Sequence, residues 1–106
     1  MPVVRVVADY EAFPLWQRDA RGTTNVDPVE LPISADLTRE LLEWADEYDG
    51  TLDRGDPLAS GFSDPQAEAA FHARGAELAA RLAAELPMGF SVEYFDGRDG
   101  RVHPVR

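Results

Sequence analysis

Three aspartates lie close together near the middle of the chain, at Asp49, Asp53 and Asp56. Several carboxylate oxygens at such spacing are the ligands that a hard cation such as Ca²⁺ or Mg²⁺ requires. The spacing does not fit an EF-hand loop, because a loop starting at Asp49 would place Thr51 at its third position and Arg54 at the sixth, where glycine is needed. We therefore expect a solvated acidic surface here, with weak surface binding of a divalent cation as the alternative.

The chain has two histidines, His72 and His103, and no cysteine. A zinc site needs several protein ligands, and neither histidine has a second histidine four residues away or a cysteine nearby. Without cysteine there is also no disulfide framework and no cysteine nucleophile. We therefore expect no metal centre and no cofactor.

Patterns of nucleophilic catalysis are also missing from the sequence. There is no G-x-S-x-G, no phosphate-binding glycine loop and no convincing Ser/His/Asp order. Any catalysis would rest on carboxylates and arginines, and would need two acids to converge in a cleft with one of them buried and its pKa raised. We expect a protein that is not an enzyme and has no catalytic residue.

The segment Glu47-Tyr48-Asp49-Gly50-Thr51-Leu52 resembles the D-x-D-G-T-L nucleophile loop of phosphatases of the haloacid dehalogenase type. The nucleophile position holds Glu47 instead of aspartate, and the preceding residues predict an amphipathic helix where that family needs a buried strand. A chain of 106 residues is also too short for the full parallel sheet of that family. We expect the C-terminal end of a helix that runs into a glycine turn.

Negative charge is concentrated between Asp27 and Asp56. This segment has ten acidic residues and two arginines, so it carries −8 of the net charge of −10. Such a local field repels nucleic-acid phosphates and anionic membrane surfaces, and it speeds association with a basic protein. We expect no nucleic acid and no membrane as partners. The first residues show no secretory signal and no apolar stretch is long enough to cross a bilayer, so we expect a cytoplasmic protein.

The beginning of the chain predicts extended structure. Residues 3–10 are rich in valine and predict a central strand. Residues 13–17 form a second extended segment, in which Pro14 must lie at an edge or a strand start because it has no N–H to donate. We expect a turn over residues 18–23 and an extended connector over 29–33.

Two helices are predicted after this connector. Ser34 is the expected N-cap of the first helix, which Gly50 ends. Its apolar residues recur at helical spacing, at Leu37, Leu41, Trp44, Ala45 and Tyr48. Ser63 is the expected N-cap of the second helix, with Gln66 in the capping box. Its apolar stripe consists of Ala67, Phe71, Gly75, Leu78, Leu82 and Leu86. Glycine inside a helix costs about 1 kcal/mol relative to alanine, so Gly75 predicts close approach of the first helix or of the sheet.

Residues 90–95 alternate as a strand, residues 96–100 predict a turn, and residues 101–105 return as a hairpin. Together these elements predict a single α+β domain over residues 1–106, in which a small antiparallel sheet has two helices packed on one face.

Three aromatic residues lie outside the helical stripes, at Phe13, Trp16 and Phe62. Large aromatic side chains either fill the ends of a small core or anchor a partner at an interface. The sequence leaves both roles open for Trp16 and Phe62.

The pattern FPLW, NVDP, LPIS, YDGTL, DP and SGF resembles small uncharacterised proteins of high-GC bacteria, and the use of arginine without lysine also suggests a GC-rich bacterial origin. A short aromatic strand carrying PLW, followed by two helices, is loosely similar to acidic immunity partners of bacterial toxins. This resemblance implies binding to a toxin but assigns no functional residue.

We therefore expect a non-enzymatic binding module, an immunity or antitoxin-like inhibitor of a basic partner. The steering charges would be Glu40, Glu43, Glu47, Asp49, Asp53 and Asp56, and Trp16 would anchor the contact. The alternative is a small soluble accessory domain, with its acidity serving solubility and a homodimer formed through exposed aromatic surface. A contiguous apolar patch beside the acidic face would favour the partner.

Overall fold

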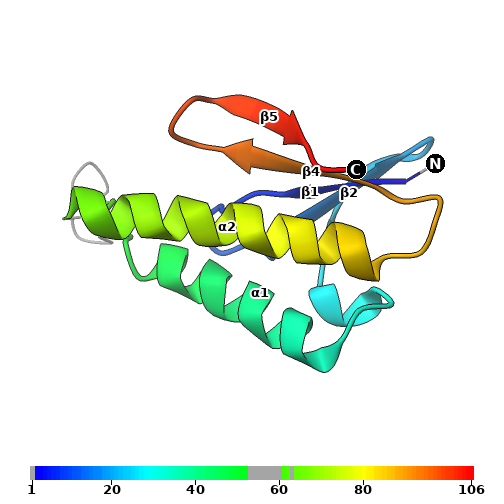
Figure 1. Cartoon of the computed structure of the whole chain (residues 1–106), viewed down its shortest axis with the longest axis horizontal. Helices are drawn as coiled ribbons and strands as arrows, with labels where there is room; N and C mark the ends of the chain where they lie inside the picture. The colour runs from blue at the N-terminus through cyan, green and yellow to red at the C-terminus, as the bar shows by residue number, and fades with distance from the viewer. Residues whose placement is uncertain (1, 53–60, 63) are drawn as a thin grey trace.

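Strand β1 (Val3–Val6) lies at the centre of a five-stranded sheet with the order β3-β2-β1-β4-β5. The computed structural model describes residues 2–52, 61, 62 and 64–106. Pairing is parallel between β1 and β4 and antiparallel between the other neighbours. The remaining strands are β2 (Leu15–Asp19), β3 (Gly22–Val26), β4 (Ser91–Asp96) and β5 (Arg101–Pro104). Both helices cover the same face of the sheet (Figure 1), so the predicted α+β fold is confirmed, with a mostly antiparallel sheet.

The turn that the sequence predicts over residues 18–23 is confined to residues 20–21, with β2 and β3 on either side, and a short 3₁₀ helix, η1 (Pro28–Glu30), begins the predicted extended connector. Gly22 begins β3 with a φ of 126°, a conformation that glycine tolerates. The strand escapes sequence analysis because it lies at the edge of the sheet and is largely exposed, so it needs no apolar alternation. The 3₁₀ helix forms because the Asp27 side chain accepts a hydrogen bond from the Val29 backbone N–H.

Helix α1 (Ala35–Asp49) begins and ends where the sequence predicts. The Ser34 hydroxyl oxygen accepts a hydrogen bond from the Leu37 backbone N–H at 3.1 Å, and Gly50 follows the last turn. The predicted stripe is buried at Leu37, Leu41, Trp44 and Ala45, and Tyr48 is half-buried against the core.

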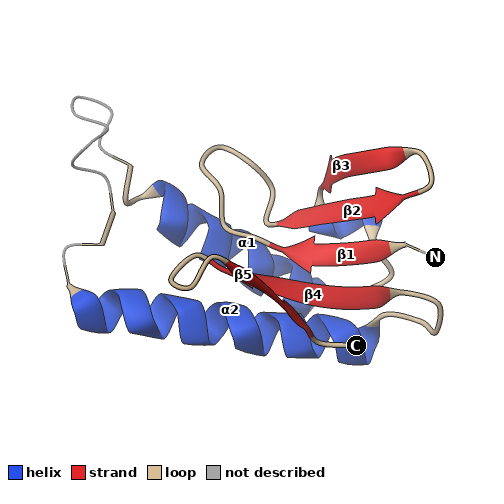
Figure 2. Ribbon diagram, turned by 90° about the horizontal axis from the view of Figure 1, so that it is seen from above, coloured by secondary structure: helices blue, strands red, loops and turns tan. Residues whose placement is uncertain are grey.

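Helix α2 (Pro65–Glu85) differs from the prediction at its N-cap and in its first turn. Its N-cap is Asp64, whose carboxylate accepts a hydrogen bond from the Gln66 backbone N–H; the predicted cap, Ser63, lies outside the described residues. Pro65 takes the first helical position, which suits its fixed φ angle. Ala67 is exposed instead of buried, because the first turn of α2 extends past the end of the sheet (Figure 2). None of the described helices is long and apolar enough to cross a membrane.

The core lies between the helices and the sheet. At Gly75, helix α2 lies closest to its neighbours. A Cβ atom at Gly75 would lie 2.5 Å from the Trp44 ring of α1 and 2.9 Å from the Tyr94 ring of β4. The predicted close approach is therefore confirmed, and both the first helix and the sheet make it. Trp44 also stacks on Phe71 with ring centroids 4.7 Å apart and donates from Nε1 to the Phe71 carbonyl oxygen.

Candidate functional site

The residues predicted to bind a partner lie on opposite sides of the molecule. Glu40, Glu43, Glu47 and Asp49 belong to α1, in the helical layer. Trp16 belongs to β2, and its neighbour Leu15 is fully buried toward the helices. Because successive side chains of a strand point to opposite faces, Trp16 points away from the helical layer. Two further predicted residues, Asp53 and Asp56, lie outside the described residues.

Arginines of α2 partly neutralise the acidic residues of α1. Arg81 forms an ion pair with Glu40, and Arg74 lies 3.6 Å from Glu43 and 3.9 Å from Glu47. Sequence analysis of the acidic segment misses these pairs, because both arginines come from the second helix. The net field along this side of α1 is therefore weaker than the segment charge indicates.

The other side of α1 borders two adjoining hollows, which we call the α1 groove. The hollows have volumes of about 270 and 520 Å³ and share Leu42 and Asp46 in their linings. Apolar side chains from three parts of the chain line them, among them Phe13 and Val29, which are 39% and 69% exposed. Four carboxylates and one guanidinium also line the groove: Glu11, Glu43, Asp46, Asp49 and Arg39. The groove is thus a contiguous apolar patch within an acidic surface.

Asp49 has a structural role at one end of the groove. Its carboxylate accepts a hydrogen bond of 2.9 Å from the backbone N–H of Glu11, whose φ of 58° is unusual for a residue other than glycine. Nearby, Tyr10 stacks on Tyr48 with ring centroids 4.5 Å apart. These contacts hold the loop between β1 and β2 against the end of α1. The predicted helix end followed by a glycine turn is confirmed, so Glu47 and Asp49 are not at the end of a buried strand.

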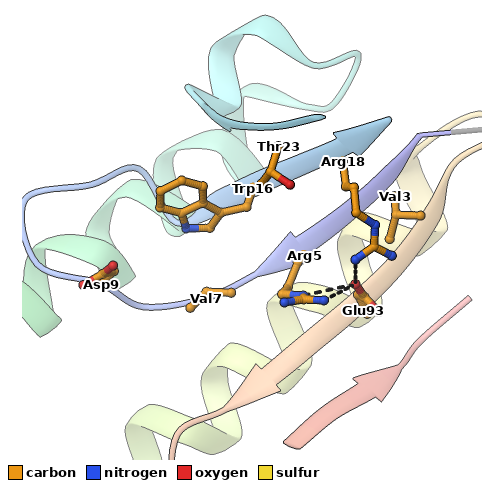
Figure 3. A pocket seen from close by; sticks show the side chains of 8 residues that line it. All are labelled: Val3, Arg5, Val7, Asp9, Trp16, Arg18, Thr23 and Glu93. Carbon is orange, nitrogen blue, oxygen red and sulfur yellow. Dashed lines mark hydrogen bonds and ion pairs between the residues drawn. The ribbon is translucent and has the colours of Figure 1, made fainter. Parts of the chain in front are cut away.

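Trp16 lies on the face of the sheet that the helices leave uncovered. There it lines a hollow of about 230 Å³ with Val3 and Val7 (Figure 3). In the same hollow, Arg5 binds the Glu93 carboxylate from Nε at 3.1 Å and from a terminal nitrogen at 3.0 Å. Register explains this grouping, because Arg5 is directly opposite both Trp16 and Glu93. Phe62, in contrast, packs against the core with its ring centroid 5.0 Å from that of Phe71.

Near the turn between β4 and β5, His103 lies close to two aspartates. Asp96, Asp99 and His103 place ligand atoms within 4.8 Å of one another, an arrangement with the donor types of a metal site. The Asp96 carboxylate, however, binds the Arg98 guanidinium at 3.0 Å, and Oδ2 of Asp99 accepts a hydrogen bond of 2.8 Å from Nε2 of His103. These carboxylates are thus engaged within the chain, and a cation would have to compete with the guanidinium.

The pKa shifts at this turn do not match carboxylate catalysis. The hydrogen bond from Arg98 lowers the pKa of Asp96, and the backbone N–H of Arg101 lowers the pKa of Asp99. A general acid at neutral pH needs a carboxyl group whose pKa is raised, so both shifts have the opposite sign. Burial raises the pKa of Tyr94 to about 12, so its hydroxyl stays protonated and donates to the His72 carbonyl oxygen.

The sequence was compared with families of known proteins. The model of the family described as Serratia CdiI immunity protein-like matches residues 2–97, which include every described element from β1 to β4. No curated protein matches the chain. The family match confirms the loose similarity to toxin immunity proteins, while an origin in a high-GC bacterium stays a prediction.

Proposed function

Because this chain belongs to the Serratia CdiI immunity protein-like family, we propose that it neutralises a protein toxin by binding to it, without catalysis of its own. The family match is the observation that carries this proposal. An inhibitor of this type needs a complementary surface and no reactive groups.

The α1 groove is the surface that we assign to the toxin. Stable interfaces combine an apolar centre with a polar rim, and the groove has Leu42 at its centre and carboxylates around it. Asp46 is exposed and forms no ion pair with the other described residues, so its charge is available to a partner. Within this proposal, Glu40, Glu43 and Glu47 supply background charge, because neighbouring arginines partly compensate them.

The sign of the groove supports a basic toxin surface. Asp46 gives the lining of the groove an exposed negative charge, and opposite charges speed the encounter of two proteins. Charges at the rim act mainly on the association rate, so single substitutions should have small effects and combined ones large effects. Asp53 and Asp56 are steering charges in the same proposal.

Affinity capture tests the partner, and growth protection tests the function. The immobilised chain should capture a basic protein from a lysate of its native cells at low salt, and high salt should weaken that capture. Co-expression of the chain with the captured protein should then restore growth that the captured protein alone prevents. A captured protein that is harmless to cells, or whose toxicity the chain does not relieve, would contradict the proposal.

Substitutions in the groove test the surface. We expect the combined variant Leu42→Ala, Glu43→Arg and Asp46→Arg to bind the captured toxin at least about tenfold more weakly, because it loses apolar contact and reverses two charges. Glu77→Arg is the control for a charge reversal, since Glu77 is an exposed acid of α2 outside the groove. Urea unfolding should show that both variants are folded. Equal affinity of the groove variant and the wild type would exclude the α1 groove.

A further inference from the structure

The uncovered face of the five-stranded sheet has no described helix above it, and its hollow lies mainly over β1, β2 and β4 (Figures 1 and 2). At its hollow, Val3, Val7 and Trp16 are half-buried and give an apolar floor. This face is separate from the α1 groove, because the sheet lies between the two. An occupant of the uncovered face therefore leaves the groove accessible.

Charges are arranged at opposite ends of this hollow. Figure 3 shows Asp9 at one end, Arg18 at the other and Trp16 between them. The Arg18 side chain is 53% exposed and lies 3.8 Å from a Glu93 oxygen that Arg5 already binds more closely. Asp9 is also exposed, and its recorded hydrogen bond is the one that its Oδ1 accepts from the Tyr10 backbone N–H. Arg18 thus keeps N–H donors for another acceptor, and Asp9 offers an acceptor.

A surface with an acid at one end, a base at the other and an aromatic ring between them is complementary to itself. A twofold axis that is parallel to the face, perpendicular to the line from Asp9 to Arg18 and close to Trp16 places the basic end of one copy over the acidic end of the other. Twofold contacts of this kind, in which the same patch of both subunits meets, are the commonest in homo-oligomers. The central Arg5–Glu93 pair is satisfied within each copy and needs no new partner.

We propose that a second copy of this chain covers the uncovered sheet face, forming a twofold dimer in which Arg18 pairs with Asp9 of the partner subunit and the two Trp16 rings meet at the axis. The two sheets form the interior of this dimer. The helical layers lie on the outside, so both α1 grooves remain open. The dimer does not depend on the identity of the toxin.

Sedimentation equilibrium with the purified chain tests the dimer directly. We expect a concentration-dependent monomer–dimer equilibrium for the wild type. Arg18→Asp and Asp9→Arg should each weaken dimerisation at least about tenfold, because each variant places like charges opposite each other twice. Arg21→Asp, which changes an exposed arginine between β2 and β3, is the control and should leave the equilibrium unchanged.

Mixing the two weakened variants is the decisive measurement. In a heterodimer of Arg18→Asp with Asp9→Arg, both cross pairs join opposite charges, so the mixture should dimerise where neither variant does alone. A Trp16→Ala variant should weaken all of these dimers. A monomeric wild type at every concentration, or a mixture that behaves as the sum of its parts, would overturn the proposal. We expect Arg18→Asp to bind the toxin as the wild type does, because Arg18 lies on the face of the sheet opposite the α1 groove, so a failure of the dimer and a failure of the proposed function are distinguishable.

Discussion

A Cβ atom on Gly75 of α2 would lie 2.5 Å from Cζ2 of Trp44 in α1, closer than unbonded carbon atoms pack. The Trp44 side chain is 1% exposed and is held on its other side by the stacked Phe71 ring. The absence of a side chain at Gly75 therefore sets the spacing of the two helices, and Tyr94 fixes the same point from the sheet.

Gly75→Ala should consequently destabilise the protein, although alanine is the better helix former. Overpacking a rigid core costs about 1–3 kcal/mol, which exceeds the helix propensity gain of about 1 kcal/mol. We expect a net loss of free energy of unfolding in urea titrations. Gly97→Ala is the control, because its Cβ would meet only His72 at an ordinary 3.8 Å. A Gly75→Ala variant more stable than the wild type would show that Trp44 and Tyr94 can move aside.

Asp96 should make the free energy of unfolding depend on pH in the acidic range. Its pKa is lowered in the folded protein by the hydrogen bond from Arg98, so the unfolded chain binds its proton at higher pH than the folded chain does. The contribution is present above the usual aspartate range and is lost as pH falls through the folded-state pKa. Asp96→Asn should flatten the loss of unfolding free energy between neutral pH and about pH 3. An unchanged slope for Asp96→Asn would contradict this assignment. Asp64→Asn, which changes the N-cap of α2, is the comparison variant.

Tyr94 should act at the opposite end of the pH scale. Burial raises its pKa to about 12 in the folded protein, above the ordinary tyrosine value of 10.0, so folding favours the protonated phenol. The contribution is complete below pH 10 and is lost as pH rises from 10 toward 12. Tyr94→Phe should remove part of this alkaline destabilisation, measured as the change in urea midpoint with pH. If the two proteins lose stability in parallel, Tyr94 does not titrate as inferred.

Arg106 should stabilise the end of α2. Its guanidinium donates to the carbonyl oxygens of Leu86 and Phe90 at 3.0 Å, and also to those of Ala83 and Pro87. Hydrogen bonds to a charged donor contribute about 1.5–3 kcal/mol and a cation at a helix C-terminus about 0.3–1 kcal/mol, so Arg106→Ala should lower the unfolding free energy by about 1–3 kcal/mol. Arg101→Ala, on an exposed strand, should have little effect in the same titration. Similar losses in both variants would argue against this role.

Arg74 should slow the encounter with a basic toxin. It lies against Glu43 and Glu47 and reduces the negative field along α1. Arg74→Ala should therefore raise the association rate about two- to threefold at low salt, and the gain should vanish at high salt. Arg21→Ala removes the same charge at a distance from α1 and is the matched control for stopped-flow measurements. A slower association of Arg74→Ala would contradict the steering role.

Local sequence patterns predict α1 and the position of the central strand, although β1 ends at Val6 and not at residue 10. The Ser34 cap, the apolar spacing of α1 and the stop at Gly50 all depend on neighbours within a few turns, and each is confirmed. Gly75 was informative because a glycine inside a helix has a clear cost and therefore implies a close neighbour. Strand β3 was missed because its residues follow the register of β2 and bury almost nothing.

The arrangement of the surface depended on the tertiary structure. Sequence alone placed the acids in one segment and Trp16 in another, and it determined the excess of negative charge. Only packing decided that the sheet lies between Trp16 and the acids, that Arg74 and Arg81 of α2 partly neutralise α1, and that Phe13, Val29 and Leu42 line one groove. The physical reason is that charge and hydropathy are properties of residues, whereas a binding surface depends on which distant residues the fold brings to the same face.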